Sequence, residues 1–212
     1  MSAASRAPLR SNRPRGHARS RRTMLFTATV AASALALTAC GSGGTSGGSG
    51  DTNFITGTDG IATVAQGERD AAPDLSGPTI DGKQLDVADY KGEIVVINVW
   101  GSWCGPCRLE AKNFVAVSAD LKDQGVQFVG INTRDTSTGP AVAFEKQYGV
   151  TYPSLYDPTG KLMLRFKKGT LNPQAIPSTL VLDRQGKIAA RTLQALSEDN
   201  LRKMLKPVLA EK

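Results

Sequence analysis

The chain has 212 residues, with 26 Lys and Arg, 19 Asp and Glu and one His, for a formal net charge of +7. Seven of the arginines lie within residues 1–39, which contain no acid, so 19 basic and 19 acidic residues remain after residue 39. A neutral body lacks the basic surface that binds phosphate backbones, which excludes a nucleic-acid-binding protein. The single histidine, His17, lies in the same arginine-rich segment. Catalytic pairs of Ser or Cys with His, and His-ligated metals, are therefore excluded from the folded part.

Residues 1–39 have the layout of a secretory signal peptide. A basic front that includes Arg21 and Arg22 precedes residues 24–39, an uncharged, alanine-rich apolar stretch. This stretch is shorter than the ~20 residues that cross a bilayer as a helix, and it ends in small residues, as secretory signals do. Residues 20–25 (SRRTML) also resemble a twin-arginine export signal, with Met24 where phenylalanine is commoner. We expect an exported protein and leave the general secretory and twin-arginine routes open.

Cys40 closes the sequence LTAC at residues 37–40, which resembles the lipobox of bacterial lipoproteins. That resemblance implies that Cys40 is acylated and becomes the first residue of the mature chain. The alternative is an ordinary residue of the apolar stretch, with cleavage elsewhere. We expect a lipid anchor on the outer, extracytoplasmic face of the cell membrane.

Residues 40–70 are expected to comprise the lipidated cysteine and a tether. Residues 41–50 (GSGGTSGGSG) have the composition of a flexible coil. Residues 51–72 carry few large apolar side chains and are expected to be loosely ordered or to pack along the domain edge. The folded domain is placed at residues 71–212, long enough for one buried core.

The first half of the domain is expected to begin with a hairpin whose turn contains Asp81-Gly82, followed by a short helical turn at residues 85–92. The run IVVI at residues 94–97 is rich in β-branched side chains and predicts a strand buried on both faces. After it comes a helix to about residue 123, stopped by Gly125, with Leu109, Phe114, Val115, Val117 and Leu121 at helical spacing.

Two cysteines, Cys104 and Cys107, stand where that strand gives way to that helix. The free N–H groups and the positive end of the helix dipole face Cys104. A thiolate is favoured there, with a pKa lowered from about 8.5 into the range of roughly 3.5–7.5. Pro106 is tolerated in the first helical turn, and Cys107 is expected to be the less exposed partner. A lone Cys-x-x-Cys supplies only two zinc ligands, so thiol–disulfide chemistry is favoured over structural zinc, and no cofactor is expected.

In the second half, the pattern predicts strands at residues 126–132, 152–157, 178–183 and 187–192, the last two forming an antiparallel pair. It also predicts helices at residues 140–148 and 197–210, with a helical turn at 162–166 between them. Ser197 is the expected N-cap of the last helix.

The combination of Trp103-Cys104-Gly105-Pro106-Cys107 with Ile176-Pro177-Ser178-Thr179 resembles the thioredoxin fold, and more narrowly the TlpA/ResA-like branch of the redoxin, or AhpC/TSA, type. The resemblance implies an α/β fold with a central mixed β-sheet flanked by helices, an N-terminal β-hairpin and a central αβ insertion between Asn132 and Ser178. It also implies that Pro177 is a cis-proline beside the disulfide and that Ile176 offers its backbone to an extended substrate. Trp103 and Trp100 would pack around the site, with one of them in the core.

The chain departs from cytosolic thioredoxins at Asn98, which stands where those proteins carry a buried Asp. Glu110 lies one turn after Cys107 on the same helix face, as in ResA-like proteins. We expect Glu110 to accept the proton of Cys107. The alternative is a solvated carboxylate near Arg108 or Lys112.

These features predict an enzyme, a protein thiol-disulfide oxidoreductase. Cys104 would attack a substrate disulfide and Cys107 would resolve the mixed disulfide. The Gly-Pro dipeptide of thioredoxin favours a reductase. The implied partners are protein dithiols and disulfides, with apocytochrome c as a client in cytochrome c maturation, and a membrane thiol carrier that supplies electrons. The alternatives are an extracytoplasmic thiol oxidase and, as a minor one, a metallochaperone-type binding module.

Overall fold

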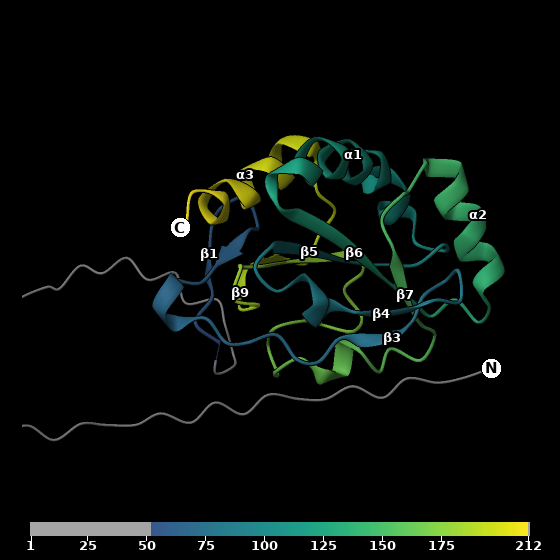
Figure 1. Cartoon of the computed structure of the whole chain (residues 1–212), viewed down its shortest axis with the longest axis horizontal. Coiled ribbons are helices and arrows are strands. Elements are labelled where there is room, and N and C mark those ends of the chain that lie inside the picture. The colour runs from purple at the N-terminus through teal and green to yellow at the C-terminus, as the bar shows by residue number, and fades with distance from the viewer. Residues whose placement is uncertain (1–51, 212) are drawn as a thin grey trace, which may run out of the picture. The chain divides into compact units, whose positions relative to one another are not determined.

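The computed structural model describes residues 52–211, which form a seven-stranded sheet with helices on both faces (Figure 1). The strand order is β1-β2-β9-β8-β5-β6-β7. β5 pairs in parallel with β6, and β6 with β7, whereas the other neighbours are antiparallel, so the sheet is mixed, as predicted. The strands are β1 (Ile55–Thr56), β2 (Ala62–Thr63), β5 (Ile94–Trp100), β6 (Val126–Thr133), β7 (Ser154–Asp157), β8 (Ser178–Leu182) and β9 (Ile188–Thr192).

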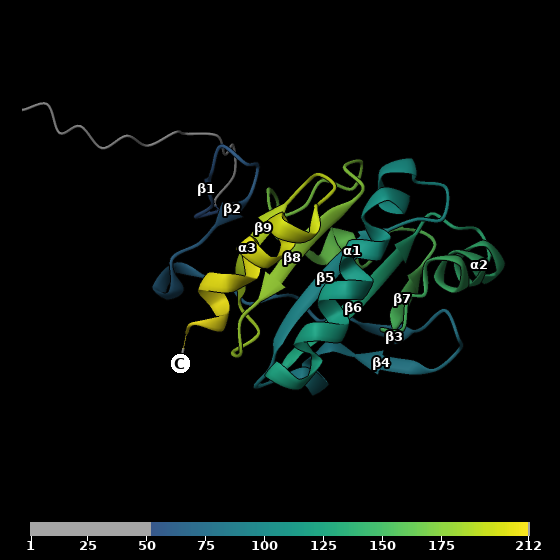
Figure 2. The ribbon, with the colours of Figure 1, turned by 90° about the horizontal axis from the view of Figure 1, so that it is seen from above.

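Helices α1 and α3 lie over one face of the sheet and α2 lies beside its β7 edge, and a hairpin and short 3-10 helices lie on the other face (Figures 1 and 2). The helices are α1 (Gly105–Leu121), α2 (Thr138–Tyr148) and α3 (Glu198–Leu209). The opposite face carries the hairpin of β3 (Ser76–Pro78) and β4 (Gln84–Asp86) and the 3-10 helices η2 (Val87–Tyr90) and η4 (Met163–Arg165); two further 3-10 helices are η1 (Gln66–Glu68) and η3 (Lys122–Gln124). The predicted hairpin, helical turns and αβ insertion are thus confirmed.

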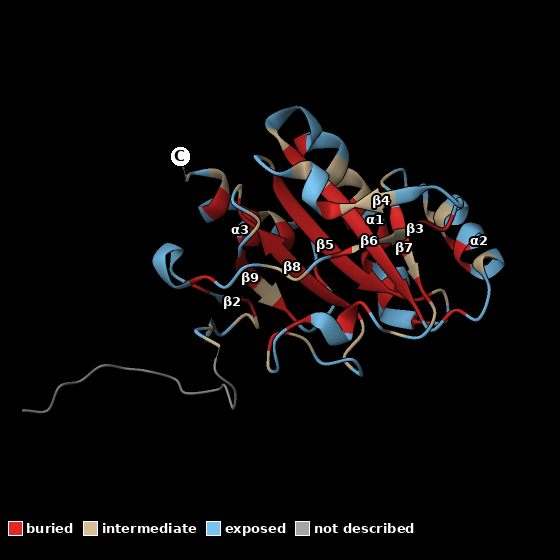
Figure 3. Cartoon of the chain, turned by 60° about the horizontal axis from the view of Figure 1, so that its bottom comes forward, coloured by how far each residue is buried: buried red, intermediate tan, exposed pale blue. Residues whose placement is uncertain are grey.

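The central strand β5 is buried along its whole length, as its β-branched run predicts (Figure 3). Its side chains alternate between two cores. Val96 belongs to the cluster beneath α1 and α3, and Val95 and Ile97 belong to the cluster on the hairpin side. Because β5 is buried on both faces, its C-terminal end at Trp100 has a fixed position in the fold. The turn that follows Trp100 therefore starts from a rigid strand.

Helix α1 starts at Gly105 and gives way to η3 after Leu121, and Gly125 then takes the left-handed conformation that ends such helices. Its buried face consists of Cys107, Glu110, Ala111, Phe114, Val117 and Leu121. Leu109, which the sequence pattern grouped with Phe114, Val117 and Leu121, is instead 80% exposed. Residue 109 lies off the stripe that the 3.6-residue repeat turns toward the sheet.

The sheet begins before the domain boundary expected at residue 71. β2 pairs antiparallel with β9, with Ala62 opposite Arg191, and Ile61 and Val64 on either side of β2 are buried. The expectation that this segment packs along the domain edge is confirmed. The segment predicted to be a signal peptide, Cys40 and the glycine-rich residues lie outside the described residues. Within residues 52–211, no helix combines the length and the apolar character needed to cross a membrane.

A cluster of charged side chains connects the segment before β3 with the C-terminal end of the described residues. Arg69 bonds to Asp183 through Nη1 at 2.9 Å and to Glu211 through Nη2 at 2.6 Å, and its Nε donates to the Val64 carbonyl. These carboxylates, Glu211 first, raise the pKa of Arg69. The cluster therefore holds the residues before β3, the β8–β9 turn and the C-terminal end in one place.

Replacing Arg69 with methionine is expected to destabilise the protein by about 2 kcal/mol, because it leaves the buried Asp183 carboxylate without its cation. The measurement is the free energy of unfolding in guanidinium chloride. Lys83→Met is the matched control, since it removes a cation from an exposed pair with Asp81 and is expected to change much less. Equal shifts in the two variants would contradict a stabilising role for the cluster.

Candidate active site

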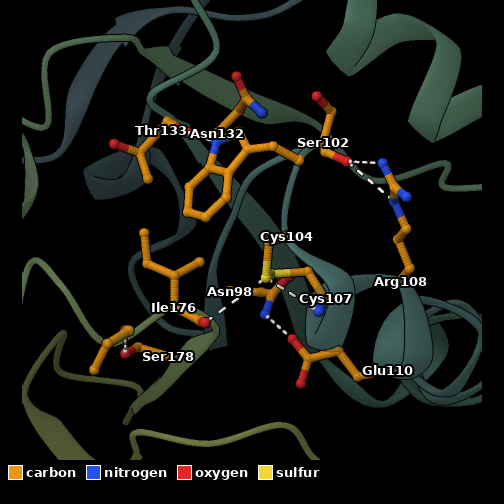
Figure 4. Close-up of a disulfide and its surroundings, with 12 residues drawn as sticks. Asn98, Ser102, Cys104, Cys107, Arg108, Glu110, Asn132, Thr133, Ile176 and Ser178 are labelled. Carbon is orange, nitrogen blue, oxygen red and sulfur yellow. Dashed lines mark hydrogen bonds between the residues drawn. A yellow bond between two sulfur atoms is a disulfide. The ribbon is translucent and has the colours of Figure 1, made fainter.

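A disulfide joins Cys104 and Cys107 where β5 leads into α1 (Figure 4). Cys104 is the N-cap of α1, and the backbone N–H of Cys107 donates to its sulfur at 3.2 Å. Both cysteines are buried, Cys107 slightly more than Cys104, while Gly105 and Pro106 between them are exposed. A sulfur at the N-cap meets the positive end of the helix dipole and a free N–H, an arrangement that stabilises a thiolate once the bond is reduced.

The second segment at the disulfide is Ile176-Pro177, whose peptide bond is cis, as predicted. The carbonyl oxygen of Ile176 lies 3.7 Å from the sulfur of Cys104 (Figure 4). Sheet register brings the two together: Ser178, the first residue of β8, pairs antiparallel with Val99 near the end of β5. The residues before β8 therefore stand beside the residues after β5.

The two tryptophans have different environments. Trp103 is 46% exposed, and its indole N–H donates to the Thr133 carbonyl at 3.3 Å. Trp100 is buried and stacks on Phe144 with ring centroids 4.4 Å apart. The expectation that one tryptophan belongs to the core is thus confirmed for Trp100, and Trp103 forms part of the surface next to the disulfide.

Glu110 is 2% exposed, so the solvated alternative for this carboxylate is wrong. Its Oε1 accepts from the amide of Asn98 and its Oε2 from the backbone N–H of Leu196, both at 2.9 Å. Burial raises its pKa from 4.5 to about 7, although the two hydrogen bonds act in the opposite direction. Figure 4 shows it on the same helix as Cys107, one turn further along. This carboxyl can exchange a proton near neutral pH.

Asp135 is a buried carboxylate that the sequence did not single out. It accepts hydrogen bonds from the backbone N–H and the hydroxyl of Ser102 and from the side chain of Asn132. The signal lay in strand order: β5 and β6 are parallel neighbours, so the residues that follow Trp100 and Thr133 meet at one edge of the sheet. Without knowledge of that pairing, the sequence gives no reason to place Asp135 nearer to Cys104 than any other acidic residue in a loop.

The structure thus brings Trp103, Cys104, Cys107, Glu110, Ile176 and Pro177 to one edge of the sheet, and Cys40 lies outside the described residues. No group of three or more His, Cys, Asp or Glu side chains in residues 52–211 is arranged to hold a metal ion. The chemistry that this arrangement offers is the making and breaking of one disulfide beside a carboxyl with a near-neutral pKa.

Comparison with known proteins gives a consistent result. The sequence model of the AhpC/TSA family matches residues 69–191. The thiol-disulfide oxidoreductase ResA of Bacillus anthracis is 26% identical over 137 residues, which are 65% of this chain and 76% of ResA. Among solved structures, a DsbF homologue from Corynebacterium diphtheriae is 36% identical with a TM-score of 0.66, and the match covers 71% of this chain and 94% of the homologue. A secreted thiol-disulfide isomerase from Corynebacterium glutamicum is 29% identical with a TM-score of 0.68, and the match covers 76% of this chain and 99% of the isomerase.

The family match spans more than half of the chain and includes both cysteines of the disulfide. The solved relatives share the fold over nearly their whole length. The chain therefore belongs to the AhpC/TSA family, as a thiol-disulfide oxidoreductase of its TlpA/ResA-like branch.

Proposed function

We propose that this protein is an exported, membrane-anchored enzyme that reduces disulfides in other proteins. The observation that carries the proposal is the Cys104–Cys107 disulfide at the N-terminus of α1, with the Ile176 carbonyl 3.7 Å from Cys104. The dithiol form of this pair is the working reductant. Each cycle transfers two electrons from the pair to a substrate disulfide.

In the first step the Cys104 thiolate attacks one sulfur of the substrate. A bond forms between Cys104 and that sulfur, the substrate S–S bond breaks, and the other substrate sulfur leaves as a thiolate. The N-cap position of Cys104 supports this assignment, because the Cys107 N–H and the helix dipole favour its ionised form. The product is a mixed disulfide between enzyme and substrate.

In the second step Cys107 attacks the sulfur of Cys104, re-forms the internal disulfide and releases the second substrate thiolate. Cys107 must first lose its proton, and it is buried away from solvent. Glu110 is the proposed acceptor: it lies one helical turn away, and its pKa of about 7 allows it to take and return a proton near neutral pH.

Substrate is proposed to bind as an extended segment across the edge formed by Ile176 and Pro177. The backbone before β8 offers main-chain hydrogen bonds, and the exposed side chain of Trp103, the residue before Cys104, provides an apolar surface. The electron donor is proposed to be a membrane thiol carrier, and the client apocytochrome c, whose haem-binding cysteines must be reduced before haem is attached.

The site of action is proposed to be the outer face of the cell membrane. Residues 1–39 are proposed as a cleaved signal peptide, and Cys40 as the lipidated first residue of the mature chain. Similarity to a protein described as secreted supports export.

The reduction potential of the Cys104–Cys107 pair tests the direction of the reaction. A reductase requires a potential below about −200 mV, close to the −270 mV of thioredoxin, whose Gly-Pro dipeptide this chain shares. The measurement equilibrates the protein with glutathione or dithiothreitol buffers and is paired with an insulin-reduction assay. A potential well above −200 mV, with slow insulin reduction, would contradict the proposed direction.

A second candidate is an oxidase or isomerase, which would use the same two cysteines at a less reducing potential than a reductase. It is favoured by the similarity to the Corynebacterium glutamicum isomerase, which covers 99% of that protein. Oxidation of reduced, unfolded ribonuclease by the disulfide form would be fast in that case and slow for a reductase.

A further inference from the structure

The turn between β5 and α1 carries both Trp103 and Cys104, and it is held from outside its own segment. Within the turn, the backbone N–H of Cys104 donates to the Gly101 carbonyl at 3.1 Å. The indole of Trp103 folds back over Gly101 so closely that a β-carbon there would lie 2.5 Å from the indole nitrogen. These contacts define the turn's shape and do not fix it relative to the sheet.

That fixing comes from Asp135. Its Oδ2 accepts from the backbone N–H of Ser102 at 2.9 Å and from the Asn132 amide at 2.6 Å, and its Oδ1 accepts from the Ser102 hydroxyl at 2.5 Å. Asp135 is buried, and no Lys or Arg in residues 52–211 comes within ion-pair distance of it. A buried carboxylate is costly unless it is hydrogen-bonded, so three donors converging on it make a rigid connection.

The segment around Asp135 reinforces this connection. The carbonyl of Thr133 accepts from the Trp103 indole, and the guanidinium of Arg134 lies 4.4 Å from the centre of the Trp103 ring. Arg134 has φ of 60°, a left-handed conformation that is uncommon for a residue other than glycine. The hydroxyl of Tyr156 donates to the Asp135 carbonyl. Residues 132–135, which we call the β6 clamp, therefore contact the turn at both Ser102 and Trp103.

On the opposite side, Arg108 of α1 donates to the Ser102 carbonyl through Nε at 3.1 Å and Nη2 at 2.6 Å (Figure 4). Ser102 thus has its N–H and hydroxyl bound by Asp135 and its carbonyl bound by Arg108. Ser102, two positions before Cys104, is therefore held both by Asp135, which follows β6, and by Arg108 of α1.

We infer that Asp135 is a positioning residue of the thiol–disulfide site, which acts through Ser102 to hold Trp103 and Cys104 in line with an incoming disulfide. The inference rests on the proposed exchange function of Cys104 and adds a residue to it. Attack on a disulfide needs alignment of the entering sulfur with the bond that breaks, and displacement of a reacting group by about 1 Å can cost on the order of 10²-fold in rate. Asp135 touches neither sulfur nor substrate in this role.

The test compares Asp135→Asn and Ser102→Ala with the parent as full mature chains. In Asp135→Asn, an NH2 group replaces one of the two carboxylate oxygens that accept hydrogen bonds from Ser102 and Asn132. This variant is expected to lower kcat/KM for insulin by about tenfold. Ser102→Ala removes one hydroxyl without changing charge and is expected to lower it by about threefold. The double variant is expected to resemble Asp135→Asn alone, because both changes break the same connection. Asp123→Asn, at an exposed position on η3, is the control.

A second readout separates positioning from stability. Two properties are expected to change in both variants under conditions in which each is fully folded. They are the NMR resonance of the Trp103 indole N–H and the quenching of Trp103 fluorescence by acrylamide. Folded variants with parental kcat/KM and a parental Trp103 signal would overturn the inference. If Asp135→Asn does not fold, Ser102→Ala alone decides. A parent protein that does not exchange disulfides would instead overturn the proposed function.

Discussion

Replacing Cys104 with serine is expected to reduce protein-disulfide exchange to the uncatalysed background, a loss on the order of 10⁴-fold or more. The expectation follows from position: Cys104 is the sulfur at the N-cap of α1, next to Ile176 and exposed neighbours Gly105 and Pro106. A serine hydroxyl at this place stays protonated at neutral pH and cannot form the mixed disulfide. The measurement is the rate of insulin reduction with dithiothreitol as electron donor.

Cys107→Ser is the matched control, because it removes the same disulfide but leaves Cys104 in place. This variant is expected to keep the first step and lose the second, so that a covalent complex with substrate accumulates on non-reducing gels. The Cys104→Ser variant should form no such complex. If instead Cys104→Ser traps substrate and Cys107→Ser does not, the roles of the two cysteines are reversed.

The central sheet could be predicted because its strands are encoded locally. The β-branched runs at Ile94–Trp100 and Val126–Thr133 are long enough to indicate buried strands without knowledge of their partners. The pairing of Ala62 with Arg191 could not be predicted in the same way. β2 has only two residues, so its position depends on the free edge of β9 rather than on its own pattern.

The same distinction divides the active site. Cys104, Cys107 and Pro177 stand in short motifs, and helix spacing alone put Glu110 on the Cys107 face. Glu110 also accepts a hydrogen bond from the backbone N–H of Leu196, which comes from a distant part of the chain. Asp135 depends on the parallel pairing of β5 with β6. Helical spacing grouped the exposed Leu109 with buried residues, because an apolar residue near the start of a helix does not reveal how far the helix is rotated against the sheet.

Glu110→Gln is expected to slow the resolving step by about 10²-fold at neutral pH, since it removes a general base from a buried site. In the parent, the rate should rise with pH through about 7, as Glu110 loses its proton and becomes able to accept one. In the variant, this rise should be absent, and resolution should wait for the ionisation of Cys107 itself at higher pH. Acid-quenched reactions between pH 5 and 9, analysed for mixed disulfide, measure this directly. An unchanged pH profile would remove Glu110 from the mechanism.

The stability of the oxidised form provides an independent check on Glu110, because neither cysteine titrates there. The folded state holds this proton up to about pH 7, whereas a pKa of 4.5 applies when the chain is unfolded. The stabilisation is thus complete below pH 4.5 and is lost as the pH rises through 7, by at most about 3 kcal/mol. The difference in unfolding free energy between parent and Glu110→Gln should fall by a comparable amount between pH 4.5 and 8. Glu68→Gln, at an exposed position, should show no such trend. A flat difference for Glu110→Gln would mean that the carboxyl has the same pKa in the folded and the unfolded chain. A carboxyl with the ordinary pKa of 4.5 is too weak a base to take the proton of Cys107.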